Sequence, residues 1–197
     1  MKTDYFDRAA KIVLQQEGGY ADITGDPGGR TKYGICERDF PSCNIQTLTQ
    51  EEALAIYRRE YWSREGIQRS CCDLMPWPLA LAHFDTVVNI GNAKRRDGEL
   101  AWAGVANENQ WVWTGIANKI LQRALGIGDD GLIGPTTIKA ISVAILGDVI
   151  YNQMELRRQY YHTLADRNPL GFGQFLRGWL KRCDHIEVEC RKESSYV

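Results

Sequence analysis

Three side chains near the N-terminus have the types and the spacing needed for acid–base chemistry. A glutamate, Glu17, is followed nine residues later by an aspartate, Asp26, and five residues after that by a threonine, Thr31. Hydrolysis of a glycosidic bond usually needs two carboxyl groups, one as an acid and the other as a base or nucleophile. A hydroxyl such as that of Thr31 could orient a water molecule or hold the aspartate. The pattern therefore favours the chemistry of a glycosidase.

A helix predicted over residues 5–16, capped by Thr3 or Asp4, must position the glutamate. Its apolar residues recur at the helical period, and Glu17 continues the same apolar face before two glycines end the helix. Partial burial and the negative end of the helix dipole both disfavour a charged carboxylate there. We therefore expect Glu17 to be a general acid. A solvated glutamate at a helix end is the alternative.

The loop after this helix is rich in turn-forming residues. Asp26 opens an Asp-Pro-Gly-Gly sequence, in which proline presets one backbone angle and glycine supplies positive φ. Asp26 could therefore be only a turn former rather than a catalytic group. Tyr20 and Tyr33 lie on either side of the turn and could stack on a sugar ring as substrate-binding residues. We expect at most a small hairpin here, between residues 20–23 and 31–35.

The motifs of this region resemble those of known lysozymes. The spacing of Glu17, Asp26 and Thr31 resembles the Glu/Asp/Thr triad of phage-type lysozymes, with one residue fewer before the threonine. The wider run, Glu-Gly-Gly-Tyr at 17–20 followed by Asp-Pro-Gly-Gly-Arg-Thr-Lys-Tyr-Gly-Ile at 26–35, looks more like the muramidases of glycoside hydrolase family 108. In that family the glutamate of Glu-Gly-Gly-Tyr is the catalytic acid, which implies this role for Glu17.

Two later segments extend the resemblance. Residues 84–91 are similar to the central helix of the family, and residues 121–125 and 130–137 are similar to its C-terminal peptidoglycan-binding-like region. On a helix, Asp85 and Asn89 share one face. We interpret them either as polar groups that brace the active-site loop or as substrate-binding residues.

The resemblance implies a specific reaction. It is the hydrolysis of peptidoglycan at the β-1,4 bond between N-acetylmuramic acid and N-acetylglucosamine, without a metal or an organic cofactor. Two other functions fit parts of the sequence. A chitinase-like glycosidase would use the same scaffold on a different sugar, and a non-catalytic cell-wall-binding protein would leave the motif around Glu17 unexplained.

Further helices are predicted from apolar periodicity and from start and stop signals. They cover about residues 49–62, 78–90, 116–125, 135–145, 148–164 and 174–190. Thr49 and Glu52 have the spacing of a capping box. We expect a mainly α, lysozyme-like fold with at most a small β-hairpin near the active site. A catalytic lobe over residues 1–91 and a peptidoglycan-binding-like helical half over residues 92–197 should pack into one compact body.

Composition restricts the partners of the chain. Its 197 residues are 44% hydrophobic and 10% aromatic, which indicates a globular protein. The formal net charge of −1 gives no bulk attraction to nucleic acid, so we expect a shaped groove to hold peptidoglycan. No apolar run approaches the ~20 residues of a membrane helix, and we expect no stable membrane insertion.

The expected setting follows from the N-terminal residues. They lack the apolar stretch of a secretory signal, which predicts synthesis in the cytoplasm. To act on the periplasmic cell wall, the protein would then need a holin or another export route. A monomeric, bacteriolytic, phage-type endolysin fits this setting, and so does a bacterial enzyme with its own export route.

Two further features leave alternatives open. The six cysteines are either thiols of a cytosolic protein or the partners of disulfides that form after export. Their spacing does not indicate a zinc site. Residues 91–114 look like an insertion, in which Trp102, Trp111 and Trp113 form a carbohydrate platform or a self-association patch, or simply pack onto the body.

Overall fold

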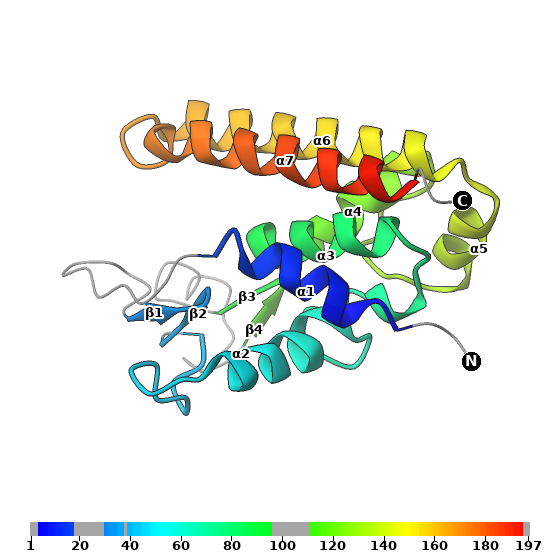
Figure 1. Cartoon of the computed structure of the whole chain (residues 1–197). Coiled ribbons are helices and arrows are strands. Elements are labelled where there is room, and N and C mark those ends of the chain that lie inside the picture. Colours follow the sequence, from blue (N-terminus) through cyan, green and yellow to red (C-terminus); the bar gives the residue numbers. More distant parts are fainter. Residues whose placement is uncertain (1–3, 18–29, 38, 96–110, 195–197) are drawn as a thin grey trace.

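A computed structural model describes residues 4–17, 30–37, 39–95 and 111–194 of the chain (Figure 1). Within these ranges the protein is mainly α, as the sequence predicts. The helices are α1 (Phe6–Leu14), α2 (Gln50–Ile56), α3 (Leu79–Ile90), α4 (Ile116–Ala124), α5 (Pro135–Val143), α6 (Leu146–Arg167) and α7 (Gly173–Ser194). A π-helix, η1 (Tyr57–Trp62), continues α2, and a short 3-10 turn, η2 (Cys72–Leu74), precedes α3.

Side-chain hydrogen bonds to the backbone mark where α1 and α2 begin. The Asp4 carboxylate accepts a hydrogen bond from the N–H of Phe6 at 3.0 Å, at the start of α1. At α2 the predicted capping box is confirmed, because Thr49 Oγ1 accepts from the N–H of Glu52 at 3.2 Å and Glu52 Oε2 accepts from the N–H of Thr49 at 2.8 Å. These local contacts satisfy backbone donors that the first helical turn leaves without partners.

Two short antiparallel strand pairs are the β-structure of the described residues. β1 (Thr31–Lys32) pairs with β2 (Ile35–Cys36), and β3 (Ala93–Arg95) pairs with β4 (Trp111–Trp113). The predicted hairpin pairs residues 20–23 with 31–35. Residues 20–23 lie outside the described part, and the observed pairing folds residues 31–36 back on themselves. The second pair was not predicted, because strands of two or three residues are too short to show a period-two pattern.

Helix α3 is the central element. It packs against α1, η1, η2, α4, α6 and α7, and every residue from Leu79 to Val87 is buried. This full burial explains why the helix is apolar nearly all round. One hydrophobic cluster runs through it and joins the two halves of the chain, with Phe6, Phe84 and Ile186 among its members.

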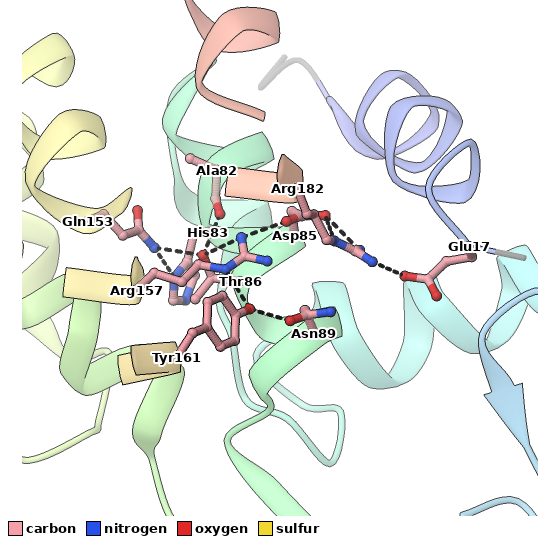
Figure 2. A network of polar contacts seen from close by, with 10 residues as sticks. All are labelled: Glu17, Ala82, His83, Asp85, Thr86, Asn89, Gln153, Arg157, Tyr161 and Arg182. Carbon is pink, nitrogen blue, oxygen red and sulfur yellow. Dashed lines mark hydrogen bonds and ion pairs between the residues drawn. The ribbon is translucent and has the colours of Figure 1, made fainter. Parts of the chain in front are cut away.

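The two longest helices, α6 and α7, form an antiparallel pair over α3 (Figure 1). The middle of α7 thereby comes close to the end of α1, where Glu17 lies (Figure 2). None of the described helices is long and apolar enough to cross a membrane. All six cysteines lie in the described part of the chain, and all remain thiols rather than disulfides.

Candidate active site

Glu17 lies three residues past the end of α1, and its side chain is only 17% exposed. Its Oε1 is 2.7 Å from Nη1 of Arg182, which comes from α7 (Figure 2). Burial favours the neutral form of a carboxyl group, whereas a neighbouring guanidinium favours the charged form. The sequence indicated only the first of these two opposing effects.

Asp85 connects this arginine to a second one. Its carboxylate is fully buried on α3, and Oδ1 accepts a hydrogen bond from Nε of Arg182 at 2.9 Å. The other oxygen, Oδ2, accepts from Nη1 of Arg157 on α6 at 2.6 Å. Burial alone would raise the pKa of Asp85, but the guanidinium groups of Arg182 and Arg157 hold it below its usual range.

This geometry decides between the two interpretations of Asp85. The side chain is 0% exposed and both of its oxygens face arginines, so in this structure it has no access to a sugar. Its assignment as a substrate-binding residue is therefore corrected. Asp85 braces Glu17 through Arg182, because an apolar helix buried on all sides turns its polar groups toward other parts of the protein.

Asn89, one turn further along α3, is half-buried rather than fully enclosed. Its Oδ1 accepts a hydrogen bond from the hydroxyl of Tyr161, and that hydroxyl accepts from Nε of Arg157 at 2.9 Å. The ring of Tyr161 stacks on Trp179 of α7, with centroids 4.9 Å apart. A role of Asn89 in substrate binding stays a prediction.

The β1–β2 turn approaches Glu17 from another direction. Tyr33 has a φ of +51°, and its carbonyl accepts a hydrogen bond from the hydroxyl of Tyr57 at 2.9 Å. Gly34, the next residue, has a φ of +75°. A Cβ at Gly34 would collide with the Tyr57 hydroxyl and would lie 2.7 Å from Oε2 of Glu17. Only glycine fits here, because the backbone of the turn packs directly against the carboxyl group.

Of the other predicted site residues, two lie in the β1–β2 hairpin and the rest lie, wholly or with their side chains, outside the described part of the chain. Thr31 lies in β1, half-buried, and Tyr33 follows that strand in the same hairpin. Asp26, Tyr20 and Trp102 lie outside the described residues, as do the side chains of Trp111 and Trp113.

Sequence reasoning missed Arg182, the residue that contacts Glu17. Arg182 lies three residues after Trp179 and four before Ile186, so it shares the inward-facing stripe of α7. A charged residue is rarely buried unless it is paired. An arginine on an apolar helix face was therefore the signal that could have indicated a buried acidic partner.

Burial also affects the phenol that faces the site. The pKa of Tyr57 is raised well above its usual range, first by burial and then by the negative charges nearby, of which Glu17 is the largest contributor. Tyr57 is therefore a neutral hydrogen-bond donor. Among the described residues, no three His, Cys, Asp or Glu side chains are grouped so that they could hold a metal ion.

Comparison with known proteins gives matches over two parts of the chain. Residues 10–91 match the family described as Glycosyl hydrolase 108, and residues 116–184 match the family described as Predicted Peptidoglycan domain. No curated protein matches the chain. Among solved structures, that of Brucella abortus SagA is similar, with a TM-score of 0.71 over 95% of this chain and 94% of that chain. With 24% sequence identity, this likeness shows a common fold.

The polar network of Figure 2 spans both matched regions. Glu17 and Asp85 lie in the first, and Arg157 and Arg182 lie in the second. The first match indicates hydrolysis of a glycosidic bond, and the second indicates peptidoglycan as the polymer that is bound. The chain thus matches the Glycosyl hydrolase 108 family over residues 10–91 and the Predicted Peptidoglycan domain over residues 116–184, and it is a peptidoglycan hydrolase of the muramidase type.

Proposed function

We propose that the protein hydrolyses the β-1,4 bond between N-acetylmuramic acid and N-acetylglucosamine, with Glu17 as the general acid. The position of Glu17 carries this proposal. The residue lies at the end of α1, within the region that matches the hydrolase family, and its carboxyl group is largely but not completely buried. A carboxyl group in such a place can reach a bound substrate while little water competes for its proton.

The remaining predicted residues have roles around this acid. Glu17 protonates the leaving oxygen. Asp26 stabilises the positively charged transition state, activates a water molecule or attacks as a nucleophile, and Thr31 positions the water or the aspartate. Tyr20 and Tyr33 stack on the sugar. The support for Thr31 and Tyr33 is that both belong to the hairpin whose turn packs against Glu17.

We also propose how the chain is divided. Residues 1–91 form the catalytic lobe, and residues 92–197 form a helical half that contributes to wall binding. The polar network supports close cooperation between them, because Asp85 of the first part is ion-paired with two arginines of the second.

The test is mass spectrometry of the soluble fragments that are released from purified peptidoglycan. Wild-type protein should release fragments with N-acetylmuramic acid at the reducing end. Glu17→Gln, which removes the acid at little steric cost, should release none while still pelleting with the wall. Glu65→Gln is a matched control, because Glu65 is an exposed glutamate; it should behave like the wild type.

The other outcomes separate the alternatives. Fragments that end in N-acetylglucosamine would keep the glycosidase but move the cleaved bond, as in a chitinase-like enzyme. Full activity of Glu17→Gln would remove Glu17 from the mechanism. If wild-type protein pellets with the wall but releases no fragments, the enzyme assignment fails and a wall-binding protein remains.

The biological setting that we propose is that of a phage-type endolysin, monomeric and bacteriolytic, that reaches the wall through a holin. Expression inside a bacterial host tests this setting. Co-expression with a holin should lyse the culture, whereas the hydrolase alone should not. Lysis without a holin would instead indicate an export route of its own.

A further inference from the structure

Arg182 joins the C-terminal half of the chain to the proposed acid. We propose that Arg182 is a positioning residue for catalysis, which holds the carboxyl group of Glu17 and stabilises the carboxylate that remains after proton donation. This inference rests on the proposed function of Glu17. It gives the region that matches a peptidoglycan domain a part in catalysis, in addition to wall binding.

The guanidinium of Arg182 is held in place by a contact other than the one with Glu17. Its side chain is 10% exposed, and on one side Nε donates to Oδ1 of Asp85 at 2.9 Å. On the other side Nη1 is 2.7 Å from Oε1 of Glu17. A planar guanidinium with donors in a rigid fork can serve two carboxyl groups in this way, and a lysine ammonium cannot copy both contacts.

The hydrogen bonds of a regular helix do not hold Glu17. It follows α1 and the C-cap residue Gln15, so it lies beyond the regular hydrogen bonds of the helix. Within the described residues, the ion pair with Arg182 holds Oε1, while the β1–β2 turn packs against Oε2. Because α3 fixes Asp85, and Asp85 fixes Arg182, the position of the acid depends on the packing of α7 against α3.

The charges of the network alternate along a row, from Arg157 through Asp85 and Arg182 to Glu17 (Figure 2). With Glu17 as a neutral acid, two guanidinium groups face one carboxylate. With Glu17 as a carboxylate, the four charges balance. The low dielectric of the site strengthens these electrostatic interactions, and with them the stabilisation of the Glu17 carboxylate that proton donation leaves.

Proton donation thus produces the state in which two guanidinium groups face two carboxylates. The proton leaves Glu17 for the glycosidic oxygen, and the bond between that oxygen and the anomeric carbon breaks with its electron pair on the oxygen. Water supplies the hydroxyl group that the anomeric carbon finally carries. Arg182 keeps all its protons throughout and faces the new carboxylate. Two phenols of η1, those of Tyr57 and Tyr61, also interact electrostatically with Glu17, and burial keeps both neutral by raising their pKa.

The pH dependence of the rate tests this role. The alkaline limb of the profile reports loss of the proton from the acid. In Arg182→Gln the positive charge next to Glu17 is gone, so this limb should move to higher pH, because a neighbouring guanidinium favours the charged form of a carboxyl group. The kcat should fall at least tenfold, with little change in KM, because the carboxylate formed in the transition state loses its partner.

Two further variants complete the design. Arg182→Lys keeps the charge but not the fork, so its alkaline limb should stay near that of the wild type while kcat remains reduced. Arg158→Gln is a control that removes the charge of another arginine of the α6–α7 pair, one that is ion-paired with Glu155, Asp184 and Glu187. It should leave both the limb and kcat unchanged.

The outcomes distinguish this inference from the proposed function. An active Glu17→Gln variant would overturn both. Suppose instead that Glu17→Gln is inactive and that Arg182→Gln folds but keeps the alkaline limb of the wild type. Then only the role of Arg182 fails, even if kcat is reduced. A merely structural residue would lower kcat without moving the limb. If Arg182→Gln does not fold, Arg182→Lys decides, and a wild-type kcat in that variant would overturn the positioning role.

Discussion

The carboxylate of Asp85 and the guanidinium of Arg157 form an ion pair at 2.6 Å between two side chains that are both 0% exposed. Asp85 lies on α3, in the region that matches the hydrolase family, and Arg157 lies on α6, in the region that matches the peptidoglycan domain. The two matched regions therefore share a buried electrostatic contact. Removal of one partner from such a pair leaves a charge without hydration and without compensation.

Asp85→Asn should therefore destabilise the whole chain strongly. The variant keeps the size of the side chain but leaves the guanidinium groups of Arg157 and Arg182 without their shared counter-charge. We expect the free energy of unfolding to fall by about 3–5 kcal/mol, as measured by urea denaturation. The control is Asp7→Asn, which removes an exposed carboxylate paired with Arg58 and should cost less than about 1 kcal/mol. Equal losses in the two variants would contradict a structural role for the buried pair.

Gly34→Ala should damage the site more than the fold. Its Cβ would collide with the Tyr57 hydroxyl and crowd Oε2 of Glu17, so the turn or the carboxyl group must move. We expect a loss of activity of at least tenfold, since small displacements of catalytic groups are costly. The measurement is the rate of peptidoglycan hydrolysis alongside thermal unfolding.

Gly126→Ala is a matched control for that substitution. Gly126 has a similar φ of +69°, but nothing lies within 4 Å of a Cβ at this position. Both variants should lose about 1–2 kcal/mol of stability from the left-handed backbone. Gly34→Ala should lose somewhat more because of its collisions, and only Gly34→Ala should lose activity. If the two variants retain equal activity, the close approach of the turn to Glu17 has no catalytic consequence.

The features predicted correctly from the sequence are those that depend on neighbouring residues. The capping box of Thr49 and Glu52 and the apolar periodicity of α3 are local, and both are present in the structure. The contact between Glu17 and Arg182 joins residues 165 positions apart, and nothing in a single sequence pairs them. Contacts of this kind depend on how the helices pack.

The misassignment of Asp85 has a related cause. A polar residue on a helix face has the same periodicity whether it faces a ligand or a buried arginine, so the pattern could not separate the two interpretations. The β3–β4 pair was missed for a different reason. Its strands lie far apart in the sequence and contain only three residues each, too few for alternation to be visible.

His83 should make the stability of the protein fall in mild acid. It is fully buried on α3, with its ring nitrogens 3.1 Å from Oδ1 of Asn118 and 3.1 Å from Nε2 of Gln153. The amide of Gln153 is a donor, so the ring is neutral and accepts on that side. Burial lowers the pKa of His83 to about 4, although the hydrogen bond with Asn118 acts in the opposite direction.

The sign of the effect follows from comparing the folded and unfolded chains. An unfolded histidine has a pKa of about 6.5, so between pH 6.5 and about 4 the unfolded chain binds a proton that the folded chain does not. Stability should therefore decrease as the pH falls through this window, by about 1.4 kcal/mol per unit and about 3 kcal/mol in total. The contribution of Asp85 is lost separately and at lower pH, because the pKa of that carboxyl group is held below its usual range in the folded chain.

Urea denaturation at a series of pH values measures directly how the free energy of unfolding changes with pH. In His83→Gln the slope between pH 6.5 and 4 should flatten by about 1.4 kcal/mol per unit, whatever the variant loses in absolute stability. His162→Gln is the control, because His162 is exposed, and it should keep the wild-type slope. A wild-type slope in His83→Gln would show that other groups cause the acid sensitivity, since the substituted side chain cannot bind a proton in this range.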